Sequence, residues 1–211
     1  MKIEVNNLSK DFKGISVLKN INVVFDEGKI YGLVGKNGSG KSVFLKILCN
    51  LYSPSGGEVL YDGKNIYKEN TFPPSTRALI EKPTFLPDLT GFENLKLLAS
   101  IQNIISDEKI NDTLKNVNLY LDKDKKYKYY SLGMKQKLGI AQVLMENPKV
   151  IILDEPFNGI EDDTVNSLRK ILKKEAKDGK IVILASHIKD DIDFLSDEVY
   201  YFDNCTIKRI K

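Results

Sequence analysis

A glycine-rich segment near the N-terminus has the residue types and spacing of a phosphate-binding loop. It reads Gly35-Lys36-Asn37-Gly38-Ser39-Gly40-Lys41-Ser42, fits the pattern G-x-x-x-x-G-K-[ST], and precedes a helix-like run that begins at Val43. Glycines let successive backbone N–H groups curl around an anion, and a helix N-terminus adds positive potential there. We expect Lys41 to reach the β- and γ-phosphates of a nucleotide and the Ser42 hydroxyl to coordinate Mg²⁺. The alternative is a glycine-rich turn that binds nothing.

Two adjacent carboxylates, Asp154 and Glu155, directly follow the apolar run Val150–Leu153. Open α/β sheets bind ligands beyond the carboxyl ends of their strands, so both acids are candidates for chemistry. Asp154 would hold Mg²⁺, and Glu155 would orient and deprotonate an attacking water. In the absence of a phosphate loop, the same pair would be read as acids at a helix N-terminus.

The only histidine, His187, lies just beyond the apolar run Ile181–Ala185. A lone histidine is often a structural residue. Here its position after a strand predicts that it emerges at the edge of the sheet that carries Asp154 and Glu155. We therefore expect His187 to contact the γ-phosphate and to act in catalysis with Glu155 and Lys41.

The segments that must position these residues include many short, apolar, strand-like runs. Such runs are typical of strands buried on both faces in a parallel sheet covered by helices, which predicts an α/β fold. The pair Asp203-Asn204 predicts a hairpin turn into a last strand over Thr206–Ile210. The other predicted strands are Lys2–Val5, Ile21–Phe25, Lys29–Val34, Glu58–Tyr61, Ala78–Ile80, Val150–Leu153, Ile181–Ala185 and Glu198–Phe202.

The stretch between the Ala78 and Val150 strands reads almost wholly as helix. Leu89–Ile101 has apolar residues at helical spacing, and Ser106 followed by two acids predicts the capped start of another helix. We expect a helical insertion in the α/β core.

Composition sets further limits. The 211 residues are 42% hydrophobic and 29% charged, as expected for a globular domain that stays in water. No apolar run approaches the ~20 residues of a membrane span. A net charge of +3 falls short of the basic excess of a nucleic-acid binder, so we expect no nucleic-acid partner. The start of the chain lacks a signal-peptide pattern, which predicts a cytoplasmic protein. Cys49 and Cys205 are predicted to be buried or inert thiols, with no part in the chemistry.

Many classes of ATPase have such a phosphate loop and acid pair, and a further segment distinguishes among them. It reads Ser131-Leu132-Gly133-Met134-Lys135-Gln136. The segment resembles the signature of ABC ATPases, usually LSGGQ, and begins 23 positions before Asp154. The resemblance covers nearly the whole chain. It implies an ABC-type P-loop core, a mostly parallel sheet with an N-terminal antiparallel portion, together with an inserted helical subdomain. The core would comprise about 1–81 and 146–211, and the subdomain about 82–145. It also implies that ATP and Mg²⁺ bind.

Further residues take roles implied by this resemblance. Phe12 occupies the place of the aromatic residue that stacks on adenine. Ser131, Gly133 and Met134 would bind the γ-phosphate held by the opposite subunit, so that two sites require two chains. Asn158-Gly159-Ile160-Glu161 resembles the loop that crosses the dimer interface, with Glu161 where the family usually has Asp.

Glu81 stands where most ABC motors carry Gln. We expect it to be an Mg²⁺ ligand, the alternative being a surface acid paired with Lys82. Together with Leu89–Leu95 and the signature segment, Glu81 resembles the bacitracin and lantibiotic immunity branch.

The resemblance implies a motor subunit that hydrolyses ATP. It would work as a homodimer or paralogue dimer on a separate integral membrane permease, at the inner face of the cell membrane, and would export antimicrobial peptide or another amphipathic substrate. The alternative is a soluble ABC ATPase of translation or DNA repair, a class that usually has tandem cassettes or a coiled-coil insertion. Neither feature occurs here.

Overall fold

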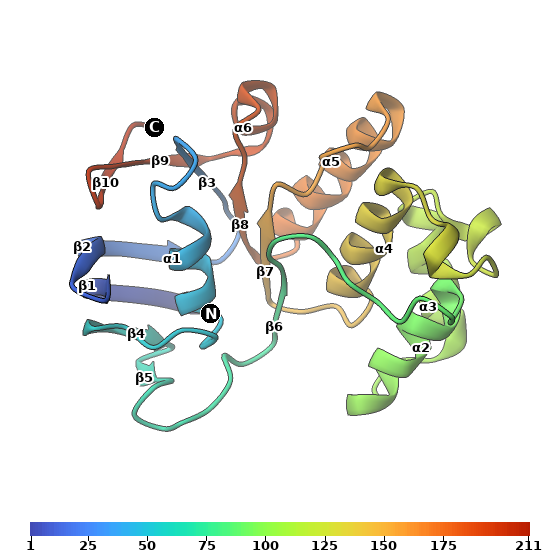
Figure 1. Cartoon of the computed structure of the whole chain (residues 1–211), viewed down its shortest axis with the longest axis horizontal. Helices are drawn as coiled ribbons and strands as arrows, with labels where there is room; N and C mark the ends of the chain where they lie inside the picture. Colours follow the sequence, from blue (N-terminus) through green and yellow to red (C-terminus); the bar gives the residue numbers. More distant parts are fainter.

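Six strands form a mostly parallel sheet at the centre of the molecule, in a computed structural model that describes all residues 1–211 (Figure 1). Their order is β10-β9-β3-β8-β7-β6, and only the β9–β10 pair is antiparallel. The strands are β3 (Ile30–Gly35), β6 (Thr76–Leu79), β7 (Val150–Asp154), β8 (Ile181–Ala185), β9 (Glu198–Asp203) and β10 (Thr206–Arg209).

A second, antiparallel sheet contains the N-terminal strands in the order β2-β1-β4-β5. Its strands are β1 (Lys2–Phe12), β2 (Ile15–Asp26), β4 (Gly56–Tyr61) and β5 (Lys64–Asn65). Helix α1 (Lys41–Leu48) lies beside this sheet in Figure 1 and links β3 to β4 in the chain.

The remaining helices lie on the other side of the central sheet, where α2, α3 and α4 gather at one end of the molecule (Figure 1). The predicted cap forms, since the Ser106 side chain accepts a hydrogen bond from Lys109 N. Thr90 and Glu93 make a capping box on α2, which had not been predicted. The helices are α2 (Gly91–Gln102), α3 (Asp107–Asn116), α4 (Leu132–Leu144), α5 (Asp162–Lys177) and α6 (Lys189–Leu195), with single 3₁₀ turns at Tyr120–Asp122 and Tyr127–Tyr129.

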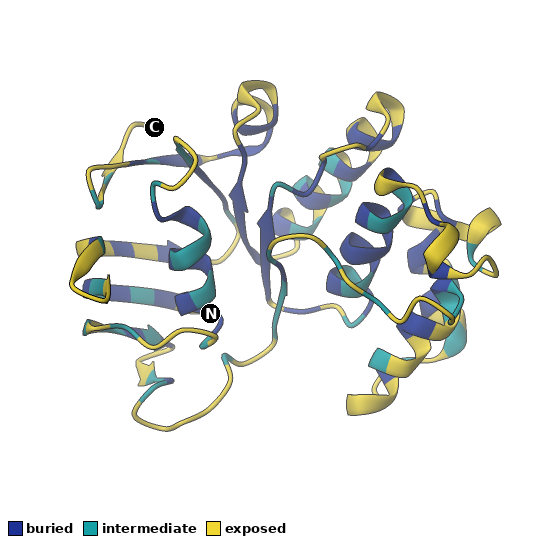
Figure 2. Ribbon diagram, in the orientation of Figure 1, coloured by how far each residue is buried: buried dark blue, intermediate teal, exposed yellow.

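The central strands are buried on both faces, as dark blue ribbons in Figure 2. Ile151 and Leu153 of β7 pack into the core shared with α2–α6, whereas Val150 and Ile152 pack into the core shared with α1 and the antiparallel sheet. Alternate side chains of a central strand therefore pack into two different cores. Both sets must be apolar, which explains the continuous apolar runs in the sequence of these strands.

The predicted strands are confirmed, but some extents were wrong. The two N-terminal strands run to Phe12 and start at Ile15, longer than predicted, because register irregularities let β1 continue past the turn-like Asn7. The predicted hairpin forms, with left-handed residues at Asn204 and Cys205. Helices α5 and α6 and strand β5 had not been predicted.

None of the helices combines the length and the apolar character that crossing a membrane requires.

Candidate functional site

The predicted phosphate loop connects the end of β3 to the start of α1. Gly38 and Gly40 have φ values of 79° and 102°, in the left-handed region that favours glycine. A Cβ at Gly40 would also lie 2.9 Å from Leu18 Cδ2 and 3.1 Å from the Val17 carbonyl oxygen. Both the backbone and its neighbours therefore require glycine at this position.

The Lys41 side chain folds back into the loop. Its Nζ donates to the carbonyl oxygens of Gly35, at 2.7 Å, and Lys36, at 3.1 Å. Burial lowers the pKa of the Lys41 ammonium, and the nearby Glu155 and Asp154 carboxylates oppose that shift. A phosphate entering the loop would compete with two carbonyls for a lysine that is already buried inside it.

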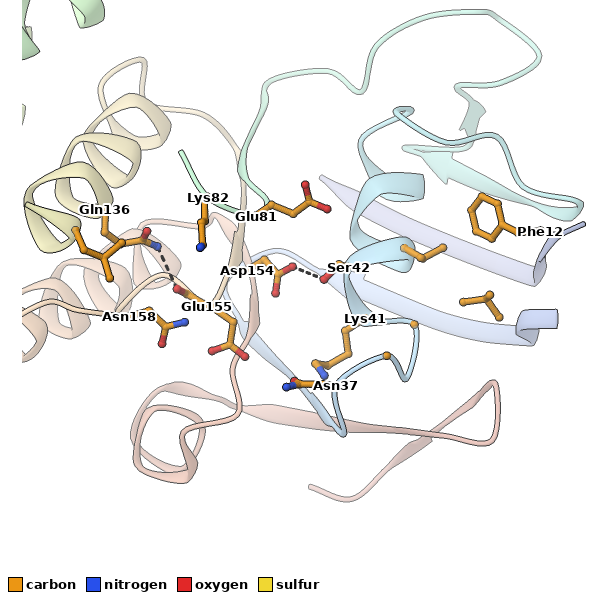
Figure 3. A pocket seen from close by; sticks show the side chains of 15 residues that line it. Phe12, Asn37, Lys41, Ser42, Glu81, Lys82, Gln136, Asp154, Glu155 and Asn158 are labelled. Carbon is orange, nitrogen blue, oxygen red and sulfur yellow. Dashed lines mark hydrogen bonds between the residues drawn. The ribbon is translucent and has the colours of Figure 1, made fainter. Parts of the chain in front are cut away.

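Ser42 meets Asp154 across the gap between α1 and β7. The Ser42 hydroxyl donates to Asp154 Oδ2 at 2.5 Å, and Asp154 is buried at the carboxyl end of its strand (Figure 3). A hydroxyl and a carboxylate are hard oxygen ligands, which suit Mg²⁺. No cluster of three or more His, Cys, Asp or Glu side chains is present, as expected where substrate phosphates and water supply the other ligands. The donor set therefore fits the predicted Mg²⁺ position.

Glu155 is held at its backbone and at its side chain. Its N–H donates to the Ala185 carbonyl at 2.8 Å, its carbonyl accepts from Gln136 Nε2 at 3.1 Å, and its φ is 48°. Oε1 accepts from the backbone N–H of His187 at 3.0 Å. His187 Nδ1 lies 2.8 Å from Oε2 but outside hydrogen-bond geometry, so this buried oxygen has no donor in the chain. An unpartnered carboxylate oxygen is what a general base needs.

These residues surround one cavity of about 900 Å³ (Figure 3), a volume suited to a nucleotide. The predicted residues that line it are Phe12, Asn37, Gly38, Gly40, Lys41, Ser42, Val43, Glu81, Asp154 and Glu155. In Figure 3, Phe12 lies at one end of the group and Gln136 at the other, with Asp154 near the middle and Glu155 between Asp154 and Gln136.

Seven predicted residues do not line this cavity. Three belong to the phosphate loop, three to the signature, and the last is the histidine: Gly35, Lys36, Ser39, Ser131, Gly133, Met134 and His187. His187 touches the site only through Glu155, and with Gly35 and Lys36 it lines a separate cavity beside α6.

The signature residues cap and pack helix α4. The Ser131 hydroxyl accepts from the Met134 N–H at 3.2 Å. A Cβ at Gly133 would lie 2.3 Å from the Gly159 carbonyl oxygen, so glycine lets the Asn158–Glu161 loop approach the helix. Glu161 pairs with Lys137 of α4 at 3.6 Å, which ties the same two segments together.

Glu81 lies two residues after the end of β6 and has a φ of 65°. Its Oε1 accepts from Lys46 Nζ of α1 at 2.5 Å, so the alternative partner considered for it, Lys82, was wrong. The Lys46 ammonium also lies 5.1 Å from the Tyr52 ring centroid, and Tyr52 makes an edge contact with Phe12 at 5.6 Å. Oε2 of Glu81 has no partner in the chain and remains available as a ligand.

Five lining residues had not been predicted as nucleotide or metal ligands: Val17, Lys82, Leu132, Gln136 and Asn158. Gln136 and Asn158 lie inside the two segments that resemble ABC motifs, so the motifs themselves were the available signal. Val17, Lys82 and Leu132 have no such signal, because only the fold brings β2, the residues after β6 and α4 to one cavity.

Comparison with known proteins gives consistent matches. The family model described as ABC transporter matches residues 18–158. An uncharacterized ABC transporter ATP-binding protein of Bacillus subtilis, YybJ, is 43% identical over 92% of this chain and 89% of its own length. The bacitracin transport ATP-binding protein BcrA of Enterococcus faecalis is 38% identical over 93% of this chain, which spans only 65% of that relative.

A lantibiotic transport ATP-binding protein of Streptococcus pyogenes, SrtF, is 33% identical over 92% of this chain and 84% of its own length. Among solved structures, an ATP-binding subunit of an ABC transporter superposes with a TM-score of 0.90, covering 100% of this chain and 90% of that one. A dimeric bacterial ABC transporter cassette superposes with a TM-score of 0.86 and 99% coverage of both chains. Both structures are 24% identical to this chain, and their similarity supports its fold.

The predicted resemblance is therefore confirmed, and the alternative of a soluble ABC ATPase is not favoured. The chain belongs to the ABC transporter family and is one of its ATP-binding, ATP-hydrolysing subunits.

Proposed function

We propose that this ATPase drives export of antimicrobial peptides, or similar amphipathic substrates, through a separate membrane permease. The observation that carries the catalytic part is the meeting of Lys41, Ser42, Asp154 and Glu155 in one cavity. The similarity to bacitracin and lantibiotic transport proteins supports the substrate class.

The candidate residues of the site take distinct roles in hydrolysis. Phe12 stacks on adenine, the loop N–H groups and Lys41 bind the β- and γ-phosphates, and Ser42, Asp154 and Glu81 hold Mg²⁺. Mg²⁺ neutralises charge that develops on the phosphates. Glu155 accepts the proton of the attacking water, and the backbone N–H of His187 holds its Oε1. We expect the His187 imidazole, which is 59% exposed and lines the neighbouring cavity, to contact the γ-phosphate once the nucleotide is bound.

The active site is completed by a second copy of the chain or a paralogue. Support comes from Ser131, Gly133 and Met134, which lie at a helix N-terminus but outside the cavity that holds Lys41. In a head-to-tail dimer those residues would bind the γ-phosphate on the partner. At low protein concentration without ATP the chain is then a monomer.

Mixing two damaged subunits tests this arrangement. A Lys41→Ala chain and a Gly133→Asp chain together form one doubly damaged site and one intact site. We expect mixed dimers to recover part of the ATPase activity that each variant lacks alone. Mixed dimers that are shown to form and yet recover nothing would argue against a shared site.

The membrane partner faces the helical subdomain, which we place at about 82–145 within the single domain, with core segments at about 1–81 and 146–211. The chain would then sit at the inner face of the cell membrane through this contact. Copurification with a candidate permease, followed by peptide-resistance measurements in cells that lack the motor, tests the transport role. A chain that neither copurifies nor alters resistance would contradict it.

A further inference from the structure

Lys82 lines the nucleotide cavity, although no role follows for it from the family motifs. It comes directly after Glu81, where the left-handed backbone, with φ 65°, turns the chain away from β6. Figure 3 shows Glu81 and Lys82 extending to different sides, with the Lys82 amino group turned toward the part of the group that contains Asp154 and Glu155.

Lys82 differs from the other charged side chains that line the cavity. Three carboxylates, Glu81, Asp154 and Glu155, face two ammonium groups, Lys41 and Lys82. Lys41 is already held by two carbonyls, and Glu81 is already paired with Lys46. Lys82 has neither an ion-pair nor a hydrogen-bond partner in the chain, so it is the lining cation free to meet an incoming anion.

A bound nucleotide would bring that anion. ATP carries about four negative charges and Mg²⁺ cancels two of them, so an unpaired ammonium close to the phosphates lowers the free energy of the complex. The terminal phosphate must lie in the part of the cavity that contains Asp154 and Glu155, because Glu155 has to reach the attacking water there.

We propose that Lys82 binds the γ-phosphate of ATP within one subunit and makes the site prefer ATP over ADP. This inference rests on the nucleotide site described under the proposed function. It adds a second lysine to that site and assigns it to selectivity for the triphosphate. ADP lacks the group that Lys82 contacts, so its affinity is independent of this side chain.

Equilibrium binding of two probes tests the inference on the purified full chain. The probes are the non-hydrolysable triphosphate AMP-PNP and ADP, each with Mg²⁺, measured by calorimetry. For Lys82→Ala we expect AMP-PNP affinity to fall about 5- to 10-fold, as for a charge-assisted contact weakened by solvent, while ADP affinity stays within about twofold. Lys82→Arg keeps the charge and should retain most of the preference.

The matched control is Lys64→Ala, which removes a lysine on β5 that is exposed, unpaired and outside the cavity, and it should change neither affinity. Equal losses for AMP-PNP and ADP in Lys82→Ala, or no loss for either, would overturn the inference. Lys41→Ala separates the two proposals, because it should weaken both probes. A wild-type chain that binds neither probe would refute the nucleotide site itself, whereas normal binding with an unchanged preference in Lys82→Ala refutes only the role of Lys82.

Discussion

The carboxylate of Glu81 joins three parts of the site through one side chain. It accepts from Lys46 of α1, it lines the cavity, and it opens the segment that leads from β6 to α2. Its side chain is 64% exposed, so the ion pair contributes at most about 1 kcal/mol to stability. Its importance lies in its position, because the ion pair connects the phosphate-loop helix α1 to the segment that leads from β6 to the helical region.

Glu81→Gln removes the charge but keeps an oxygen that can accept from Lys46. We expect MgATP affinity and turnover of the isolated chain to stay within a few fold, because Lys41, Ser42 and Asp154 are untouched. Peptide resistance in cells should change, because we propose that coupling to the permease runs through this segment.

Lys46→Met is the matched control, since it breaks the same ion pair and leaves the carboxylate in the cavity. If peptide resistance changes in both variants, the effect comes from loss of the Lys46–Glu81 ion pair. If it changes in Glu81→Gln alone, the effect comes from loss of the Glu81 carboxylate as a Mg²⁺ ligand. Full resistance in Glu81→Gln at matched expression would contradict the coupling role and weaken the assignment to the peptide-immunity branch.

Sequence reasoning identified single residues wherever a motif fixes both residue type and spacing. Lys41, Ser42, Asp154 and Glu155 are brought to one cavity, as expected from strands that end at the same edge of a sheet. The partner of Glu81 could not be read in the same way. Lys46 is 35 residues away in the chain, and only the packing of α1 beside the end of β6 puts the two charges together.

At the scale of elements, the N-terminus of α4 and the Asn158–Glu161 loop form one unit. Gly133 and Gly159 lie against each other's segments, with Leu132 over Gly159, and Gln136 ties the helix to the Glu155 carbonyl. This unit connects the signature to the general base within one chain. Damage to it should therefore affect both stability and assembly.

Gly133→Ala tests that unit. The new Cβ would lie 2.3 Å from the Gly159 carbonyl oxygen, so the backbone must shift. We expect a loss of about 1–2 kcal/mol in the free energy of unfolding, the strain of overpacking less the better helix propensity of alanine. Urea denaturation measures it, and ATP-dependent dimerisation should weaken in parallel. An unchanged free energy of unfolding would show that the Asn158–Glu161 loop can move away from the new Cβ without loss of stability.

The strands and helices that could be predicted best from the sequence are the most deeply buried ones. Strands β7 and β8 were predicted nearly to the residue, because burial on both faces leaves an uninterrupted apolar run. Helix α5 was missed although Val165, Leu168, Leu172 and Ala176 recur at helical spacing, so a signal was present. The lengths of β1 and β2 could not be predicted from the sequence, because the pairing of β1 with β2 and with β4 contains shifts of register.

The whole molecule is organised by two cores on opposite faces of the central sheet. Cys49 follows α1 at the edge of one of them, 8% exposed, and burial raises the pKa of its thiol to about 12. Cys205 lies in the hairpin between β9 and β10 and is less buried. The two thiols therefore report on different parts of the fold.

A thiol reagent at pH 8 should modify Cys205 quickly and Cys49 only as fast as the core opens. The Cys205→Ser variant isolates the slow reaction and measures the free energy of that opening. Because the pKa is raised in the folded state, the contribution of Cys49 to stability is intact below the unfolded value near 9.0 and is lost as the pH rises toward 12. Equal rates for both thiols would contradict the burial of Cys49.

The proposed motor requires the general base Glu155 and closure of the site by a second chain. Glu155→Gln keeps the shape of the side chain and its contact with the His187 N–H but removes the proton acceptor. Glu69→Gln, an exposed acid outside the cavity, is the matched control.

Phosphate release and light scattering in the presence of MgATP measure both properties in one sample. In Glu155→Gln we expect ATP affinity within a few fold of the wild type, hydrolysis reduced about 10²-fold or more, and a stable ATP-bound dimer. Turnover equal to the wild type, with the Glu69→Gln control also unchanged, would remove Glu155 from the role of base and contradict the account.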